Sequence, residues 1–280
     1  ITRQHREVFG SVVVLCASTL ESTRIMLNST SDQHPTGIAN SSGVLGHYLM
    51  DHVMGGGAAG VLPVLKNTPD TRGTRPNGIY IPRFRNITDR HSKFLRGYGY
   101  QGNASVVKWG HAMSVEGFGE SFKNEVKNNR PWTISIGGFG EHLPQYDNFC
   151  ELDKVHTDAW GIPILHISAA YGDNEQKMVD DMADAAEEML HAAGAEDIEV
   201  RRDISVPGLA IHEVGTARMG DGPVSSVLNT WEQAHDVSNL FVMDGSGYPS
   251  SACQNPTITF MALATRACEY LVEEFRAARL

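Results

Sequence analysis

The sequence predicts a mixed α/β and α+β fold made of two interleaved regions. An apolar strand pattern lies near each end of the chain, at residues 8–16 and 240–243. The middle of the chain instead carries short apolar runs broken by Gly, Pro and Asn, which is typical of an antiparallel sheet. We therefore expect residues 1–45 and 203–280 to pack together, and residues 46–202 to form a separate sheet-plus-helix region.

The N-terminal region is expected to contain a strand followed by a short helix. Residues 8–16 are mostly apolar and predict one strand, and residues 20–27 carry apolar side chains at helical spacing. Small residues, Ala17, Ser18 and Thr19, join the two elements. They would allow the backbone to approach a ligand, although an ordinary strand-to-helix turn with a Ser or Thr cap explains them too.

The middle region is expected to hold two central strands, one helix and a closing strand. Residues 133–140 alternate like a half-buried strand, residues 163–171 resemble another, and residues 144–162 form a long excursion between them. Residues 174–193 have a methionine-rich apolar stripe at helical spacing, which favours core packing, and residues 198–202 close the sheet. The Gly-rich run at 55–60 indicates a flexible or closely packed strand region.

The C-terminal region combines a buried strand, a tight turn and a long helix. The strand at 240–243 ends at Asp244 and Gly245, which predict the turn. Pro256 suits a helix's first position, so Asn255 is the expected N-cap. The helix start would present free N–H groups and a positive dipole end, which suit an anion, including one that forms only during a reaction.

Composition excludes several classes of protein. The formal charge of −10 and the absence of a basic block argue against a nucleic-acid partner. A locally basic and aromatic stretch within residues 64–130, which includes Arg72 and Arg75, is interpreted as a loop over a site or a contact with a partner chain.

No run approaches 18 apolar residues, so a soluble folded protein is expected. The four cysteines lack CxxC spacing, which favours buried free thiols, notably Cys16 and Cys268.

Three runs in the chain resemble one known family. They are His212-Glu213-Val214-Gly215-Thr216-Ala217-Arg218-Met219-Gly220, the strand ending in Asp244-Gly245, and Asn255-Pro256-Thr257. Together with Val12-Val13-Val14-Leu15-Cys16-Ala17-Ser18-Thr19-Leu20-Glu21 near the start, they resemble the C-terminal portion of the glucose-methanol-choline (GMC) flavin oxidoreductases. The Asn-Pro form is similar to the sugar-oxidising branches of that family.

The resemblance implies an FAD-dependent enzyme that oxidises an alcohol group of a sugar or polyol. His212 and Asn255 match the family's catalytic pair, with His212 as base and Asn255 orienting the substrate oxygen. The matching cofactor-binding residues are Ala17, Asp244, Gly245, Asn255, Pro256 and Thr257. On the same resemblance, residues 1–45 and 203–280 are the remainder of a Rossmann-like FAD-binding domain, and residues 46–202 are the substrate-binding domain.

One element of a flavin-binding protein is absent from the sequence. No strand, GxGxxG turn and helix occur in order, and the chain opens at Ile1 in charged residues. We therefore expect a missing N-terminal half or a partner chain to complete the FAD site. The alternative is a non-catalytic fragment or binding subunit that needs a partner chain to hold FAD.

Other kinds of site receive less support. His47, Asp51 and His52 could suggest a metal site, but the segment resembles a structural crossover in the family, so no metal is expected. A hydrolase is disfavoured because the sequence has neither GxSxG nor HExxH. The cellular compartment, cytoplasmic or periplasmic, stays open on these residues.

Overall fold

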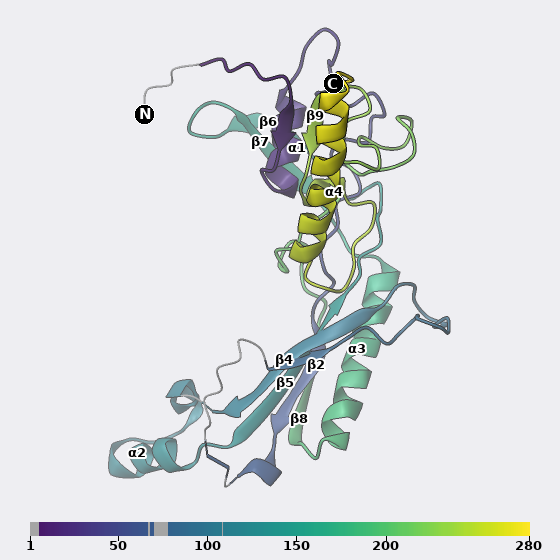
Figure 1. Ribbon diagram of the computed structural model, residues 1–280. Coiled ribbons are helices and arrows are strands. Elements are labelled where there is room, and N and C mark those ends of the chain that lie inside the picture. The colour runs from purple at the N-terminus through teal and green to yellow at the C-terminus, as the bar shows by residue number, and fades with distance from the viewer. Residues whose placement is uncertain (1–5, 67, 70–77, 108) are drawn as a thin grey trace. The chain divides into compact units, whose positions relative to one another are not determined.

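The computed structural model describes residues 6–66, 68–69, 78–107 and 109–280, and these form two compact units (Figure 1). The first contains the described residues through His52, together with His142–Tyr171 and Val206–Leu280. The second contains Val53–Glu141 and Gly172–Ser205. The expected mixture of helices with an antiparallel sheet is therefore confirmed. Residues 142–171 lie in the first unit, although the expected division at 46–202 put them with the sheet.

The second unit is a five-stranded antiparallel sheet with one long helix on it. The strand order is β3-β4-β5-β2-β8. The strands are β2 (Gly56–Val61), β3 (Ile79–Ile81), β4 (Tyr98–Val106), β5 (Trp132–Gly140) and β8 (Glu196–Arg202). Helix α3 (Asp173–Ala192) lies along one face of the sheet, and short helices η1 (Pro63–Leu65), η2 (Trp109–Ser114) and α2 (Gly119–Asn128) lie in the connections (Figure 1). The predicted strand at 133–140, helix at 174–193 and closing strand at 198–202 are confirmed.

Glycines in the strands allow α3 to pack very close to the sheet. A Cβ at Gly56 would lie 2.6 Å from the Cβ of Met182, and one at Gly138 would lie 2.5 Å from its Sδ. The methionine stripe of α3 is fully buried at Met178 and Met182. The interpretation of the Gly-rich run as a closely packed strand, and of the stripe as core, is thus confirmed.

Alanine at Gly138 should destabilise the protein, whereas alanine at the adjacent Gly137 should not. The new methyl group at position 138 would overlap the buried Met182 side chain, and overpacking of this kind costs about 1–3 kcal/mol. At position 137 nothing among the described residues lies within 4 Å of the added methyl. Denaturant unfolding of both variants measures the difference, and equal midpoints would show that the close contact is not real.

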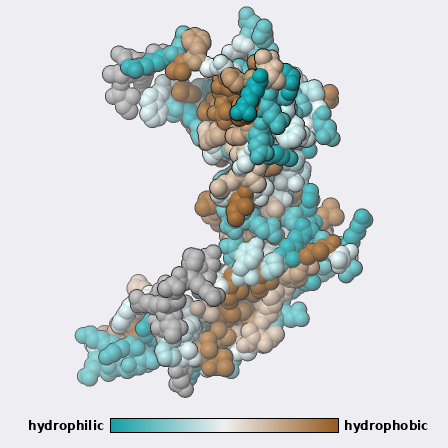
Figure 2. Space-filling view, viewed as in Figure 1, coloured by the Kyte–Doolittle hydropathy of each residue, from teal (hydrophilic) through white to brown (hydrophobic). Residues whose placement is uncertain are grey.

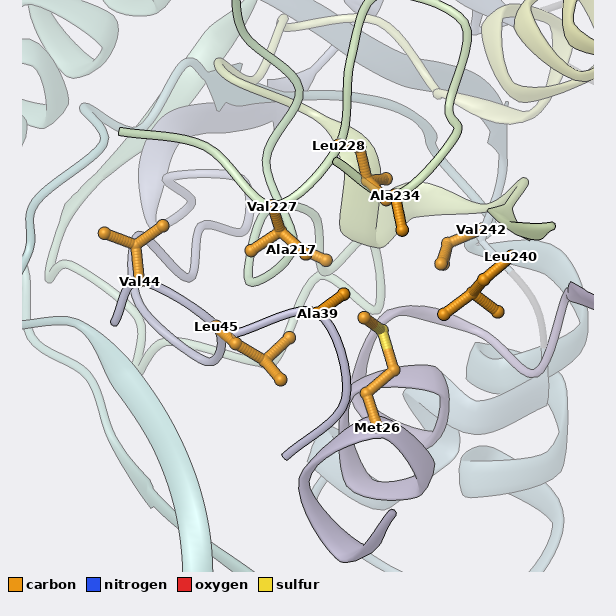
Figure 3. Packing of buried hydrophobic residues seen from close by; sticks show 10 residues of the cluster. All are labelled: Met26, Ala39, Val44, Leu45, Ala217, Val227, Leu228, Ala234, Leu240 and Val242. Carbon is orange, nitrogen blue, oxygen red and sulfur yellow. The ribbon is translucent and has the colours of Figure 1, made fainter. Parts of the chain in front are cut away.

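The first unit holds a short parallel strand pair between two helices. Strand β1 (Val13–Leu15) pairs in parallel with β9 (Leu240–Val242), so the two apolar end segments do meet as expected. Helix α1 (Thr19–Asn28) follows β1, the short helix η3 (Gly245–Gly247) follows β9, and helix α4 (Thr257–Arg276) comes next along the chain. Figure 3 shows Met26 of α1 packed with Leu240 and Val242 of β9 and with side chains from the intervening loops.

Three expectations for this unit are wrong in detail. The first strand spans Val13–Leu15 rather than residues 8–16, because its β9 partner begins opposite Val13. Residues 144–162 are not an excursion, since they contain β6 (Phe149–Thr157), which forms an antiparallel hairpin with β7 (Pro163–Ser168). Cys16 and Cys268 are exposed rather than buried, although all four cysteines are free thiols as expected.

The basic stretch of the second unit is held in place by ion pairs. Arg83 pairs with Glu141 at 2.5 Å, and Arg85 pairs with Asp181 at 2.7 Å. Arg72 and Arg75 lie outside the described residues. Among the helices in the described ranges, none is both long and apolar enough to cross a membrane.

Candidate functional site

Two cavities of the first unit share the side chain of His212. The larger, which we call the cofactor groove, has a volume of ≈ 410 Å³. Its walls come from the β1–α1 turn, the His212 segment, the end of β9 and the start of α4. The second, which we call the substrate pocket, has a volume of ≈ 320 Å³. Its polar lining residues are His52, His212, Tyr248, Ser250, Ser251, Gln254 and Thr259. Pro256 also lines both cavities, so they have a common wall.

His212 is half-buried and packs against a second histidine. The rings of His52 and His212 are 4.9 Å apart between centroids and meet edge to face at 84°. The backbone N–H of His212 donates to the carboxylate of the buried Asp51 at 3.1 Å. The Nδ1 atom of His212 is buried and has no hydrogen-bond partner among the described residues. His212 therefore lines both cavities while one of its ring nitrogens is withdrawn from solvent.

Asn255 is not the N-cap of α4, which corrects the expectation from sequence. The helix begins at Thr257 and its cap position is Pro256. Pro256 already has helical dihedral angles, and its carbonyl accepts the first intrahelical bond, from Phe260 N–H at 3.0 Å. Asn255 itself is exposed, between two residues that line the substrate pocket, Gln254 and Pro256. Asn255 thus lies one residue before the capping position and does not line the pocket itself.

The Asp244 carboxylate is tied into the turn that follows β9. It accepts bonds from Ser22 Oγ at 2.5 Å, from Ser246 N–H at 3.0 Å and from Ser246 Oγ at 2.6 Å. Gly245 has no room for a side chain, since a Cβ there would lie 2.5 Å from Thr19 Oγ1. Both residues line the cofactor groove. Three of the four lone-pair positions of the carboxylate are therefore used by bonds between described residues.

The β1–α1 turn supplies the opposite wall of the cofactor groove. Cys16 and Ser18 line it, and Ala17 lies between them with its N–H bonded to Ser22 Oγ at 3.0 Å. Ser18 has a φ of 75°, a left-handed conformation that is uncommon for a residue other than glycine. The structure thus brings Asp244, Gly245, Pro256 and Thr257 to a single groove, whereas Ala17 lies between two lining residues without lining the groove itself.

A buried carboxyl, Glu232, lies behind the β9 turn. Burial raises its pKa to about 7, Arg266 opposes the shift, and the charge of Asp244 adds to it. The Oε2 atom is buried with no partner among the residues that the structure describes. Glu232 is therefore a group whose charge changes near neutral pH, and it lines neither of the two cavities.

Stability should fall between pH 5 and pH 8 because of Glu232. A carboxyl with a raised pKa in the folded state favours folding when protonated, so its contribution is complete below about pH 4.5 and is lost as the pH rises through about 7. The difference is on the order of 3 kcal/mol. Glu232→Gln should remove this slope, and Glu273→Gln on exposed α4 should not. Urea unfolding at several pH values decides, and equal slopes in both variants would contradict the assignment.

Sequence reasoning missed the partners of His212. His52 was noted only as a metal-site alternative, and Tyr248, Ser250 and Ser251 were not noted at all. His52 lies 160 positions before His212, so no local spacing could pair them. The sequence feature that could have indicated His52 as a site residue is the run Leu49-Met50-Asp51-His52, which lies next to an apolar segment.

Solved structures show where this fold occurs. The chain superposes on the crystal structure of pyridoxine 4-oxidase from Mesorbium loti with a TM-score of 0.61 at 18% identity. The match covers 95% of this chain and 52% of that chain. The fold of this chain thus also occurs in that oxidase, where it corresponds to about half of the structure.

The family follows from the sequence comparisons. Residues 144–264 match the family model described as GMC oxidoreductase. A 2-methyl-1,2-propanediol dehydrogenase of Mycolicibacterium austroafricanum is 32% identical over 98% of this chain and 50% of its own length. The expected resemblance to the C-terminal portion of the GMC oxidoreductases is therefore confirmed.

Two further relatives share this pattern of partial coverage. The fructose dehydrogenase large subunit of Gluconobacter japonicus is 27% identical over 98% of this chain and 49% of its own length. The gluconate 2-dehydrogenase flavoprotein of Pantoea cypripedii is 27% identical over 56% of this chain and 27% of its own length. The chain thus spans about half the length, or less, of these curated relatives.

Proposed function

We propose that the chain carries the catalytic part of an FAD-dependent oxidoreductase that oxidises an alcohol group of a sugar or polyol. The observation that carries the proposal is the position of His212, which lines both the cofactor groove and the polar substrate pocket. A base at this common wall can reach a substrate on one side while the cofactor lies on the other.

The cofactor groove suits a flavin in its chemistry. We assign Ala17, Asp244, Gly245, Asn255, Pro256 and Thr257 to holding it. The first turn of α4, a helix of 20 residues, offers backbone N–H groups and the positive end of the dipole at Thr257. These groups favour negative charge in the groove. A bound FAD supplies the hydride acceptor for the reaction.

His212 and Asn255 divide the work on the substrate oxygen. The hydroxyl proton moves to the imidazole of His212, because histidine is the side chain that most often serves as a general base. The side-chain amide of Asn255 donates a hydrogen bond to the same oxygen while staying neutral. Together they favour the alkoxide-like state from which the carbon gives up its hydride.

The lining of the substrate pocket favours a polyhydroxylated substrate. Ser250, Ser251 and Gln254 offer both donors and acceptors, which match hydroxyl groups, and Tyr248 adds a phenol. The related proteins are named for a diol, for fructose and for gluconate. A sugar or polyol is therefore the substrate class that we assign.

The strand pair of the first unit supports the assignment of residues 1–45 and 203–280 to part of an FAD-binding domain. Parallel sheets are normally buried on both faces, and two strands alone are marginal in water. Here β1 exposes Val13 and Val14, and Figure 2 shows hydrophobic surface around that strand. Further strands from an N-terminal half or a partner chain would cover it. Residues 46–202 are then assigned to substrate binding. Within that range, residues 142–171 belong to the first unit.

The second candidate function is a binding subunit without catalysis of its own. The exposed Val13 and Val14 of β1 are the observation behind it, because that surface calls for a partner chain, and the partner would then supply the chemistry. Anaerobic mixing of the purified protein, with its partner if one copurifies, with a panel of sugars and polyols separates the two. Bleaching of the flavin absorbance by a sugar or polyol supports catalysis, and unchanged absorbance with every alcohol supports the binding subunit.

A further inference from the structure

The buried carboxylate of Asp51 binds three backbone N–H groups from two distant segments. Asp51 is only 3% exposed. Its Oδ1 accepts from His52 N at 2.7 Å and from His212 N at 3.1 Å, and its Oδ2 accepts from Ala210 N at 3.0 Å. Hydrogen bonds to an ionised acceptor are stronger than those between neutral groups. The Asp51 side chain therefore links residues 210–212 to the segment that carries His52 by hydrogen bonds.

Ile211 lies between Ala210 and His212, whose N–H groups bond to Asp51, and it has an unfavourable backbone conformation. Ile211 has a φ of 57°, in the left-handed region that β-branched residues almost never adopt. Its side chain is 78% exposed, so packing does not hold it there. Such conformations persist where the surroundings over-determine them. The bonds from Ala210 and His212 to one carboxylate supply that constraint.

The far end of the segment is held independently of Asp51. Val214 exchanges two backbone hydrogen bonds with Met50, each 2.9 Å long. His212 lies between this bridge and the strained Ile211. Its ring position, edge to face with His52 at 4.9 Å, thus depends on both anchors. Loss of the Asp51 anchor would leave the bridge intact and release residues 210–212.

We propose that Asp51 is the positioning residue of the site: its carboxylate holds Ile211 in the left-handed conformation and thereby sets the His212 and His52 rings against each other at the substrate pocket. The effect on rate rests on the proposed function, whereas the effect on backbone geometry does not.

The amide protons of Ala210 and His212 test the geometric part directly. In the wild-type protein both should exchange slowly with solvent, although neighbouring Leu209 and Ile211 are exposed. Asp51→Asn keeps the shape of the side chain, but it replaces one acceptor oxygen by an NH₂ donor. We expect exchange at Ala210 and His212 to accelerate in this variant by at least about tenfold, the loss of one charge-assisted bond. Exchange at Val214 should stay unchanged.

The rate of flavin reduction tests the functional part. Asp51→Asn should lower kcat by about ten- to hundredfold with little change in KM, because bonds to charged groups are lost and the base is displaced. Adding Ile211→Gly should recover part of the loss, since glycine enters the left-handed region without penalty. Adding Ile211→Ala, which removes the same side chain, should recover less. Asp236→Asn, which removes an exposed loop contact to Ser41, serves as the control and should leave kcat unchanged.

The outcomes separate the positioning role from the proposed reaction. Fast exchange of Ala210 and His212 in the wild type would overturn the positioning role even if Asp51→Asn does not fold. So would unchanged exchange in Asp51→Asn, or equal recovery by Ile211→Gly and Ile211→Ala. A wild-type flavin that no alcohol reduces would instead reject the proposed function, and the exchange measurement would still decide the role of Asp51.

Discussion

Replacement of His212 by alanine should slow flavin reduction by about 10² to 10⁴ fold, the usual contribution of a positioned proton acceptor. The reason is that His212 is the titratable side chain that lines both the cofactor groove and the substrate pocket. Substrate binding should change less, because the hydroxyl and amide groups of the pocket remain. The rate of flavin reduction is measured by rapid mixing of the His212→Ala protein with a saturating polyol under anaerobic conditions.

A second histidine provides the matched control. His235 is also half-buried, and its Nε2 lies 3.0 Å from Ser226 Oγ, but it lines neither cavity. His235→Ala should therefore leave the reduction rate within a few fold of the wild type. A His212→Ala protein that is reduced at the wild-type rate, or a comparable loss in both variants, would remove His212 from the proposed chemistry.

The 280-residue chain without a partner should bind FAD weakly or not at all. In dinucleotide-binding folds the pyrophosphate is held by the N–H groups of a Gly-rich turn at a helix N-terminus, and this sequence contains no such segment. The residues assigned to the flavin side lie on an open groove next to exposed β1. Absorbance of the desalted chain after incubation with FAD measures the retained cofactor.

Riboflavin provides the matched comparison for that experiment. It carries the ring system but lacks the pyrophosphate and adenosine, so the isolated chain should bind FAD no more tightly than riboflavin. The complete protein should strongly prefer FAD. Stoichiometric FAD on the isolated chain after purification, or a large preference for FAD over riboflavin, would show that the chain holds the phosphates itself.

Elements with a clear apolar period could be predicted from the sequence, and polar ones could not. Helix α3 was evident because its methionine stripe repeats at helical spacing, and β5 because it alternates. Strand β6 was missed, since Glu151, Asp153 and Lys154 interrupt it, and it is a half-exposed arm of a hairpin. Strand β6 forms because it pairs with β7, and the periodicity of a single segment carries no information about such a pairing.

The candidate site was predictable where its residues lie in continuous motifs. The segments around His212, Asp244 and Pro256 do meet at the cofactor groove. The grouping of Asp51 and His52 with His212 was not predictable, because it depends on backbone hydrogen bonds between residues about 160 positions apart. The helix start was misplaced by one residue because Pro256 itself adopts helical angles at the cap.

We propose that a carbinol carbon loses its hydride in the pocket lined by His212, and an isotope measurement tests this most directly. The flavin-loaded protein is mixed anaerobically with a polyol that it oxidises, either unlabelled or deuterated at the carbinol carbon. Reduction should be clearly slower with the deuterated substrate, and the effect should persist at saturating concentration. Equal reduction rates for the two substrates, or flavin that no alcohol reduces, would contradict the account.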